Sequence, residues 1–143
     1  MHRDIKPANI LESATGYKIA DLNTAKVVVT RDPLAHTQIG TPYYACPETW
    51  KDEEYSEKCD VWSLGVVMYE LAALKLPFPA QNKEELNRRI VEMEPLPLNS
   101  DYFSKFFRKL IESMLSKNEF DRPSTRQILE HCEMYQRVKR ETE

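Results

Sequence analysis

The chain has 143 residues, of which 41% are hydrophobic and 30% charged, with three Gly and nine Pro. This composition is that of one soluble globular domain and excludes collagen-like, low-complexity and disordered chains. Twenty Lys plus Arg against 23 Asp plus Glu give a net charge of -3 with both signs scattered, so no basic bias points to nucleic acid or an anionic membrane.

The N-terminal part of the chain predicts a small β-hairpin. Residues 9–11 and 17–20 are strand-like and flank a polar stretch at residues 13–16. Residues 22–50 then show no sustained periodicity. A loop of that length inside a compact domain is usually functional or disordered.

The rest of the chain predicts helices. Residues 59–74 are apolar on nearly every side, which favours a helix buried in the middle of the domain. Residues 83–93 carry one apolar stripe and predict a surface helix. Between about residues 104 and 116 large apolar residues recur at steps of three and four. Ser124 and Gln127 fit a capping box that opens a last helix running to about Met134.

Three cysteines, Cys46, Cys59 and Cys132, are an odd number, separated by 13 and 73 positions. This spacing matches neither a disulfide framework nor a zinc site, so we expect reduced cytosolic thiols. The longest charge-free apolar run, residues 61–69, is too short to cross a bilayer. The first residues lack the apolar segment of a signal peptide. The prediction is a cytoplasmic protein without membrane partners.

The candidate catalytic residues lie in the run HRDIKPAN at residues 2–9, together with Asp21 after the hairpin. Phosphoryl transfer needs a carboxylate to take up the proton of the acceptor hydroxyl, a cation over the transferred phosphate, and oxygen ligands for Mg²⁺. Asp4, Lys6 and the pair Asn9 and Asp21 supply these groups in that order. An aspartate alone in a loop is more often a cap, but this set at this spacing reverses that expectation.

These residues resemble the catalytic loop and metal motif of the protein kinase family, and the likeness continues to about residue 133. GTPYYACPE at residues 40–48 resembles the substrate-facing loop and its Ala-Pro-Glu motif, here Cys-Pro-Glu. DVWSLG at residues 60–65 is similar to the start of the buried central helix, and RPS at residues 122–124 to the late arginine motif. Several motifs in the right order make a chance match improbable.

The resemblance implies ATP and Mg²⁺ as cofactors and a role for each matching residue. Asp4 is then the catalytic base, Lys6 steadies the γ-phosphate, Asn9 and Asp21 hold Mg²⁺, and Leu11 packs under the adenine. Lys6 together with GTPYY at residues 40–44 resembles serine/threonine kinases. In that class Thr41 helps to bind Asp4 and Lys6, so the implied partners are proteins with Ser or Thr acceptors.

The resemblance also implies a regulatory pair. Arg3 precedes the catalytic aspartate, where the family's arginine receives a phosphate from the activation loop, and Thr37 stands where that phosphate is added. The spacing in LAHTQIGTPYY at residues 34–44 and the run KLPF at residues 75–78 look most like the NIMA-related kinases. That likeness hints at cytoskeletal or ciliary partners.

Other matching residues have structural roles in the family. His2 belongs to a hydrophobic spine with Leu22, and Asp60 anchors the catalytic-loop backbone from the central helix. Glu48 and Arg122 form a buried ion pair, and removing one partner of such a pair costs about 3 to 5 kcal/mol. His36, His131 and the cysteines show no metal spacing.

Two departures from the family pattern qualify these expectations. Asn23 stands where the family has a glycine after the metal aspartate, although Asn tolerates a left-handed backbone. The 143 residues also contain no glycine-rich loop, strand lysine or hinge of the N-terminal lobe.

The expected fold is therefore mainly α, a protein-kinase-like C-terminal lobe at residues 1–134 with a small β-hairpin, followed by a tail at residues 135–143. We expect exposed apolar surface and little or no kinase activity from this polypeptide alone. The alternative function is a non-catalytic, pseudokinase-like binding or regulatory module.

Overall fold

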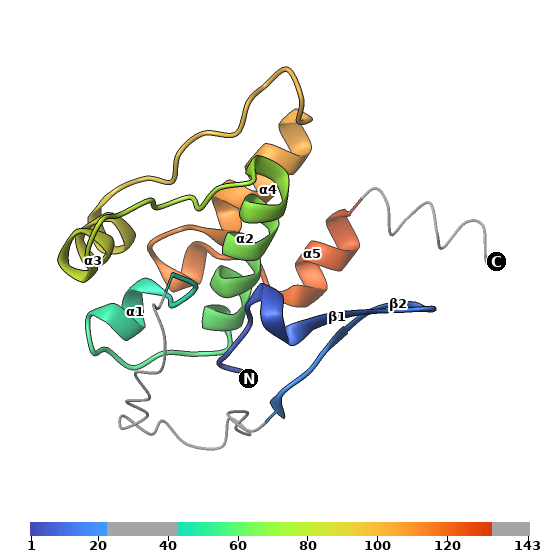
Figure 1. Cartoon of the computed structure of the whole chain (residues 1–143), viewed down its shortest axis with the longest axis horizontal. Coiled ribbons are helices and arrows are strands. Elements are labelled where there is room, and N and C mark those ends of the chain that lie inside the picture. Colours follow the sequence, from blue (N-terminus) through green and yellow to red (C-terminus); the bar gives the residue numbers. More distant parts are fainter. Residues whose placement is uncertain (23–42, 133–143) are drawn as a thin grey trace.

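A computed structural model of the chain describes residues 1–22 and 43–132 (Figure 1). Helices dominate, and the described strands form one two-stranded sheet, as the sequence predicts. In chain order the elements are η1 (Pro7–Asn9), β1 (Ile10–Ser13), β2 (Gly16–Ile19), α1 (Pro47–Trp50), α2 (Lys58–Ala73), α3 (Lys83–Glu92), α4 (Lys105–Met114), η3 (Glu119–Asp121) and α5 (Thr125–His131).

The predicted hairpin is confirmed. β1 and β2 pair antiparallel with Ile10 opposite Ile19 and Ser13 opposite Gly16. Gly16 has φ of 119°, a backbone conformation that favours glycine, and its carbonyl oxygen accepts a 2.7 Å hydrogen bond from Ser13 Oγ. A short turn of this kind returns the chain toward η1. The hairpin projects from the helical body on the side of α5 (Figure 1).

α2 is the central element, and the other helices surround it (Figure 1). Trp62, Val66 and Tyr69 lie on α2 and are almost wholly buried. The core around them holds further buried residues from the other helices and from the segments between helices: Cys46, Phe78, Leu86, Ile90, Leu98, Ile111 and Leu115. Burying large apolar side chains of this kind contributes about 1.5 to 3 kcal/mol each, so α2 organises the stability of the domain.

The prediction that α2 is buried on every side is wrong for its C-terminal end. Leu71 is 70% exposed and Leu74, the C-cap residue, is 89% exposed. Their neighbours Ala72 and Ala73 still pack against the core, and Leu74 has φ of 54°, which ends the helix. The expected exposed apolar surface is therefore present here, and Leu11 and Ile19 of the hairpin are also exposed.

Side chains cap the N-terminal ends of α3, α4 and α5. Asn82 Oδ1 accepts from Glu85 N at 2.8 Å to begin α3, and Ser104 Oγ accepts from Phe107 N at 3.1 Å to begin α4. The capping box that opens α5 is present with both of its hydrogen bonds. α5 runs to His131, after which Cys132 has an extended backbone and its N–H donates to Leu129 O. The expected end near Met134 lies outside the described residues.

The loop prediction for residues 22–50 missed α1, which is too short to show a period and begins with Pro47 in its first turn. None of the helices in the described residues is long and apolar enough to cross a bilayer.

Candidate active site

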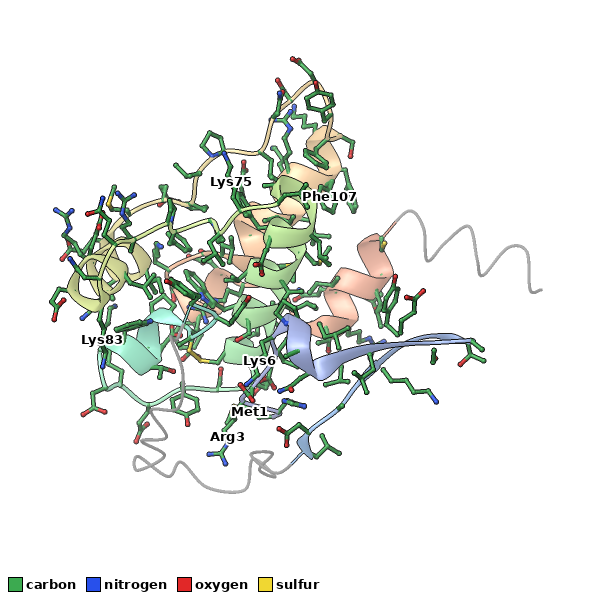
Figure 2. All side chains as sticks on the ribbon, viewed as in Figure 1. Met1, Arg3, Lys6, Lys75, Lys83 and Phe107 are labelled. Atoms are coloured by element: carbon green, nitrogen blue, oxygen red, sulfur yellow. A yellow bond between two sulfur atoms is a disulfide. The ribbon has the colours of Figure 1, made fainter. Side chains whose placement is uncertain are left out.

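The segment before η1 is held by the start of α2. The carboxylate of Asp60 accepts hydrogen bonds from His2 N at 2.6 Å and from Arg3 N at 2.8 Å. Arg3 has φ of 73°, an uncommon conformation for a residue with a Cβ, so the two bonds hold a backbone that is costly by itself. Arg3 and Lys6 lie at the end of the molecule where α2 begins (Figure 2).

Asp4, Lys6 and Asn9 are in direct contact. Lys6 Nζ donates to Asp4 Oδ2 at 2.8 Å, and Asn9 Nδ2 donates to the same oxygen at 2.9 Å and to Asp4 O at 2.8 Å. Asn9 is buried, whereas the side chains of Lys6 and Asp4 remain 37% and 31% exposed. The buried amide orients the carboxylate, and the carboxylate keeps a face open to solvent.

The return strand of the hairpin leads to Ala20, which is hydrogen-bonded to the segment at residues 2–9, and Asp21 follows in the chain. Ala20 N donates to Asn9 O at 2.8 Å, and Ala20 O lies 2.9 Å from His2 Nε2. Ala20 therefore contacts both ends of the segment at residues 2–9, and Asp21 is the next residue in the chain. Asp21 has φ of 62° and is exposed.

The remaining predicted residues differ in exposure, and three of them lie outside the described residues. Leu11 in β1 is 53% exposed and Leu22 is 67% exposed, while His2 is buried. Thr37, Thr41 and Asn23 lie outside the described residues. A cavity of about 230 Å³ lies between α2, α4 and residues 94–98, and none of the predicted site residues lines it.

Glu48 and Arg122 form a buried, two-pronged ion pair. Arg122 Nη2 donates to Glu48 Oε1 at 2.5 Å and Nη1 donates to Oε2 at 3.0 Å. Arg122 also donates through Nε to Ser116 O at 2.8 Å and through Nη2 to Lys117 O at 3.2 Å. The guanidinium thus joins α1 to the segment after α4, where it satisfies two backbone carbonyl groups.

A second anchor near α1 was missed by sequence reasoning. Tyr44 Oη donates to Glu70 Oε2 at 2.8 Å, and Ser63 Oγ donates to Tyr44 O at 2.7 Å. Burial and the neighbouring Glu70 raise the pKa of the Tyr44 hydroxyl above its ordinary value. The partners are 26 and 19 positions from Tyr44, and no spacing rule in the sequence connects them.

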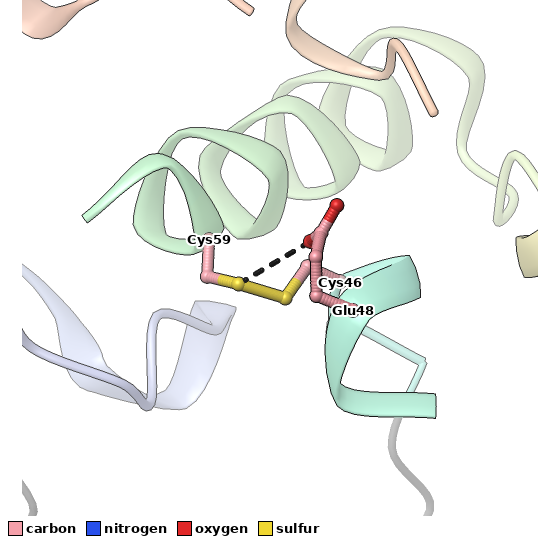
Figure 3. A group of neighbouring side chains, drawn as sticks. All are labelled: Cys46, Glu48 and Cys59. Atoms are coloured by element: carbon pink, nitrogen blue, oxygen red, sulfur yellow. Dashed lines mark hydrogen bonds between the residues drawn. A yellow bond between two sulfur atoms is a disulfide. The ribbon is translucent and has the colours of Figure 1, made fainter. Parts of the chain in front are cut away.

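The expectation of reduced cysteines is wrong for Cys46 and Cys59, which the structure joins in a disulfide (Figure 3). They are 13 positions apart in the chain, but the fold brings their Cα atoms to 5.4 Å from each other, a distance that a disulfide spans. Counting cysteines cannot reveal that approach. Cys132 is a free thiol.

The chain is similar in sequence to known protein kinases. A family model described as Protein kinase domain matches residues 1–132. The chain belongs to the protein kinase family. It is 41% identical over 130 residues to serine/threonine-protein kinase Nek4 of Mus musculus, and 41% identical over 131 residues to serine/threonine-protein kinase Nek5 of Homo sapiens. It is 39% identical over 133 residues to putative serine/threonine-protein kinase A of Trypanosoma brucei brucei.

The alignments cover 90%, 90% and 91% of this chain but 16%, 18% and 31% of those three proteins. This kinase chain therefore spans less than a third of the length of these relatives. The likeness to the NIMA-related kinases is confirmed, because the matching relatives include Nek1, Nek2 and Nek4, each named a serine/threonine-protein kinase.

Proposed function

We propose that residues 1–132 form the part of a serine/threonine protein kinase that receives the protein hydroxyl and transfers to it the γ-phosphate of ATP. The observation that carries this proposal is the contact of Lys6 Nζ and Asn9 Nδ2 with one oxygen of Asp4, on a segment anchored by Asp60. Family membership supports the same reaction class.

Asp4 is proposed as the group that orients the acceptor hydroxyl and takes up its proton. Two donors fix Oδ2, which leaves the carboxylate oriented and part-exposed toward an incoming hydroxyl. Lys6 keeps its ammonium group beside that carboxylate, so its positive charge can stabilise the negative charge of a phosphate bound there. Preorganised charge of this kind lowers the barrier because no reorganisation is needed during transfer.

The donor set fits Mg²⁺. Asn9 makes its two described side-chain hydrogen bonds through Nδ2, so its amide oxygen can serve as a ligand. Asp21 carries a carboxylate one residue after Ala20, whose N–H donates to Asn9 O. Hard oxygen ligands are those that Mg²⁺ prefers. When bound with ATP, the ion neutralises charge on the phosphates, and Asn9 and Asp21 are the residues proposed to hold it. Leu11 is proposed to cover the adenine.

Regulation by the pair Arg3 and Thr37 is part of the proposal, as is the contact of Thr41 with Asp4 and Lys6. Phosphate on Thr37 adds roughly two negative charges, which a guanidinium binds through paired hydrogen bonds. Loss of activation in Thr37→Ala, with unphosphorylated activity unchanged, is the expected result. Equal activation in the variant would exclude this role.

Protein partners with Ser or Thr acceptors follow from the proposed function, and cytoskeletal or ciliary partners are a prediction from family likeness.

The test compares the 143-residue chain with the same chain fused behind the N-terminal lobe of mouse Nek4, assayed with Mg·ATP and a protein substrate. We expect little or no transfer from the chain alone and clear transfer from the fusion. Asp4→Asn should lower kcat by about 10² to 10⁴. Asp101→Asn, an exposed loop aspartate, is the matched control and should behave as the parent.

Two results would overturn the proposal. A folded fusion without transfer would favour the non-catalytic binding module instead. Transfer that survives Asp4→Asn would exclude Asp4 as the group that takes up the proton.

A further inference from the structure

Cys46 and Cys59 tie two elements together inside the core. Cys46 is the N-cap residue of α1, and Cys59 is the second residue of α2. Only 1% of Cys46 and 7% of Cys59 is exposed. The disulfide therefore links the C-terminal end of the segment that precedes α1 to the central helix (Figure 3).

Each sulfur of the pair has a polar side-chain neighbour that could form a hydrogen bond with the reduced thiol. Glu48 Oε2 lies 3.5 Å from Cys59 Sγ, and Thr49 Oγ1 lies 3.2 Å from Cys46 Sγ. In the disulfide neither sulfur carries a hydrogen. After reduction the Cys59 thiol can donate to the Glu48 carboxylate, and the Thr49 hydroxyl can pair with Cys46. Neither state leaves a buried polar group stranded.

The fold around the pair does not depend on the covalent bond. Arg122 holds Glu48 at two oxygens, and Tyr44 is held by Glu70 and Ser63. These contacts connect α1 and its preceding residues to α2 and to the C-terminal part without using either sulfur. Breaking the disulfide is therefore expected to loosen α1 locally and to leave the domain folded.

We propose that Cys46 and Cys59 are a reversible redox modification site, oxidised by a peroxide and reduced by a dithiol. Cys59, the more exposed of the two, loses its thiol proton, and its sulfur attacks one peroxide oxygen. The O–O bond breaks, Cys59 becomes a sulfenic acid, and the leaving hydroxide takes up the released proton to form water. Cys46 sulfur then attacks the sulfenic sulfur of Cys59, forming the S–S bond as hydroxide leaves and takes the Cys46 proton. Two thiols are oxidised by two electrons, and hydrogen peroxide is reduced to two waters.

A metal ion is the competing occupant. Ligand atoms of Cys46, Glu48 and Cys59 lie within 4.8 Å of one another. Both oxygens of Glu48 are already bound by Arg122, which leaves two sulfurs. Structural zinc sites use four ligands, so the geometry favours the disulfide over the metal.

Oxidation at this site reaches the candidate active site through neighbouring residues. Cys59 precedes Asp60, whose carboxylate holds the backbone of His2 and Arg3. The disulfide restrains α1 relative to that anchor. An effect on phosphoryl transfer would rest on the proposed function, whereas the redox chemistry itself does not.

The test uses the reduced, folded 143-residue chain treated with hydrogen peroxide and then alkylated. Mass spectrometry should find one cross-linked peptide pair containing Cys46 and Cys59, with Cys132 alkylated as the internal control. Dithiothreitol should restore both thiols without loss of helicity. Hydrogen exchange at residues 43–60 should be about tenfold slower in the oxidised form. Cys46→Ser and Cys59→Ser are matched variants in which oxidation should leave that exchange unchanged.

Quantitative alkylation of Cys46 and Cys59 after peroxide would overturn the proposal. So would a cross-link to Cys132, unfolding on reduction, or stoichiometric binding of added zinc by the reduced pair. The mass measurement needs no variant and no kinase activity, so failure here is distinct from failure of the proposed function.

Discussion

Lys117 places a cation against aromatic rings beside the core. Its Nζ lies 4.1 Å from the ring centre of Phe78 and 5.0 Å from that of Trp62, and it donates to Ile90 O at 2.7 Å. Burial lowers the pKa of Lys117 from its usual 10.5 to about 8, although the charge of Glu94 opposes the shift. In this balance desolvation outweighs the attraction of the neighbouring carboxylate.

The lowered pKa predicts stability that rises in mild alkali. Between pH 8 and pH 10.5 the unfolded chain keeps a proton that the folded chain releases, so the free energy of unfolding increases with pH. The slope stays below about 1.4 kcal/mol per pH unit, the value for one full proton. Urea unfolding at pH 7 and 9.5, in a Cys132→Ser background, should show this rise in the parent but not in Lys117→Met. Lys109→Met, at an exposed position, should keep it, and an equal rise in both variants would assign the effect elsewhere.

Glu48 illustrates the cost of an unpaired buried charge. Glu48→Gln leaves the fully buried Arg122 side chain without its anionic partner, so we expect a loss of about 3 to 5 kcal/mol in the free energy of unfolding. Arg126→Gln removes one partner of an exposed helix pair and should change stability little. Chemical denaturation measures both, and similar small changes would mean that water reaches Arg122.

At the scale of elements, the approach of α2 to α4 depends on Gly65. A Cβ at this position would lie 2.9 Å from Met114 Cβ and 3.1 Å from Leu115 Cδ2. Met114 Cβ is attached directly to the backbone, so it cannot rotate away. The two helices therefore pack closely because residue 65 has no side chain.

Gly65→Ala accordingly sets two effects against each other. Alanine favours the helix by about 1 kcal/mol, whereas crowding in a packed core costs about 1 to 3 kcal/mol. We expect crowding to win and the thermal midpoint to fall by a few degrees, because a contact of 2.9 Å forces α4 to shift. A midpoint equal to or above that of the parent would show that α4 moves aside without cost.

At the scale of the whole molecule, Asp60 couples the N-terminal segment to the central helix across 57 and 58 positions of sequence. Asp60→Asn replaces one of two acceptor oxygens by a donor that faces a backbone N–H. We expect amide exchange at residues 2–9 to become about tenfold faster while α4 keeps its protection. Asp121→Asn, at an exposed site in η3, is the control. Unchanged exchange at residues 2–9 would mean that other contacts hold the segment.

Local patterns in the sequence were sufficient for the elements that depend on near neighbours. The hairpin, the amphipathic α4 and the capping box of Ser124 and Gln127 all arise from residues within a few positions of each other. Kinase membership was also readable, because the motifs lie in order along the chain. Periodicity and caps act over one or two turns, so their signal survives in a single sequence.

Tertiary structure alone decided which distant groups meet and which apolar surface stays open. The Cys46–Cys59 disulfide, the anchoring of Tyr44 by Glu70 and the exposure of Leu71 each depend on how α2 lies against its neighbours. The sequence by itself determined the elements, the family and the residue types available at the candidate site. Their pairing was settled only by packing, since contacts between distant residues depend on the positions of whole helices and not on spacing along the chain.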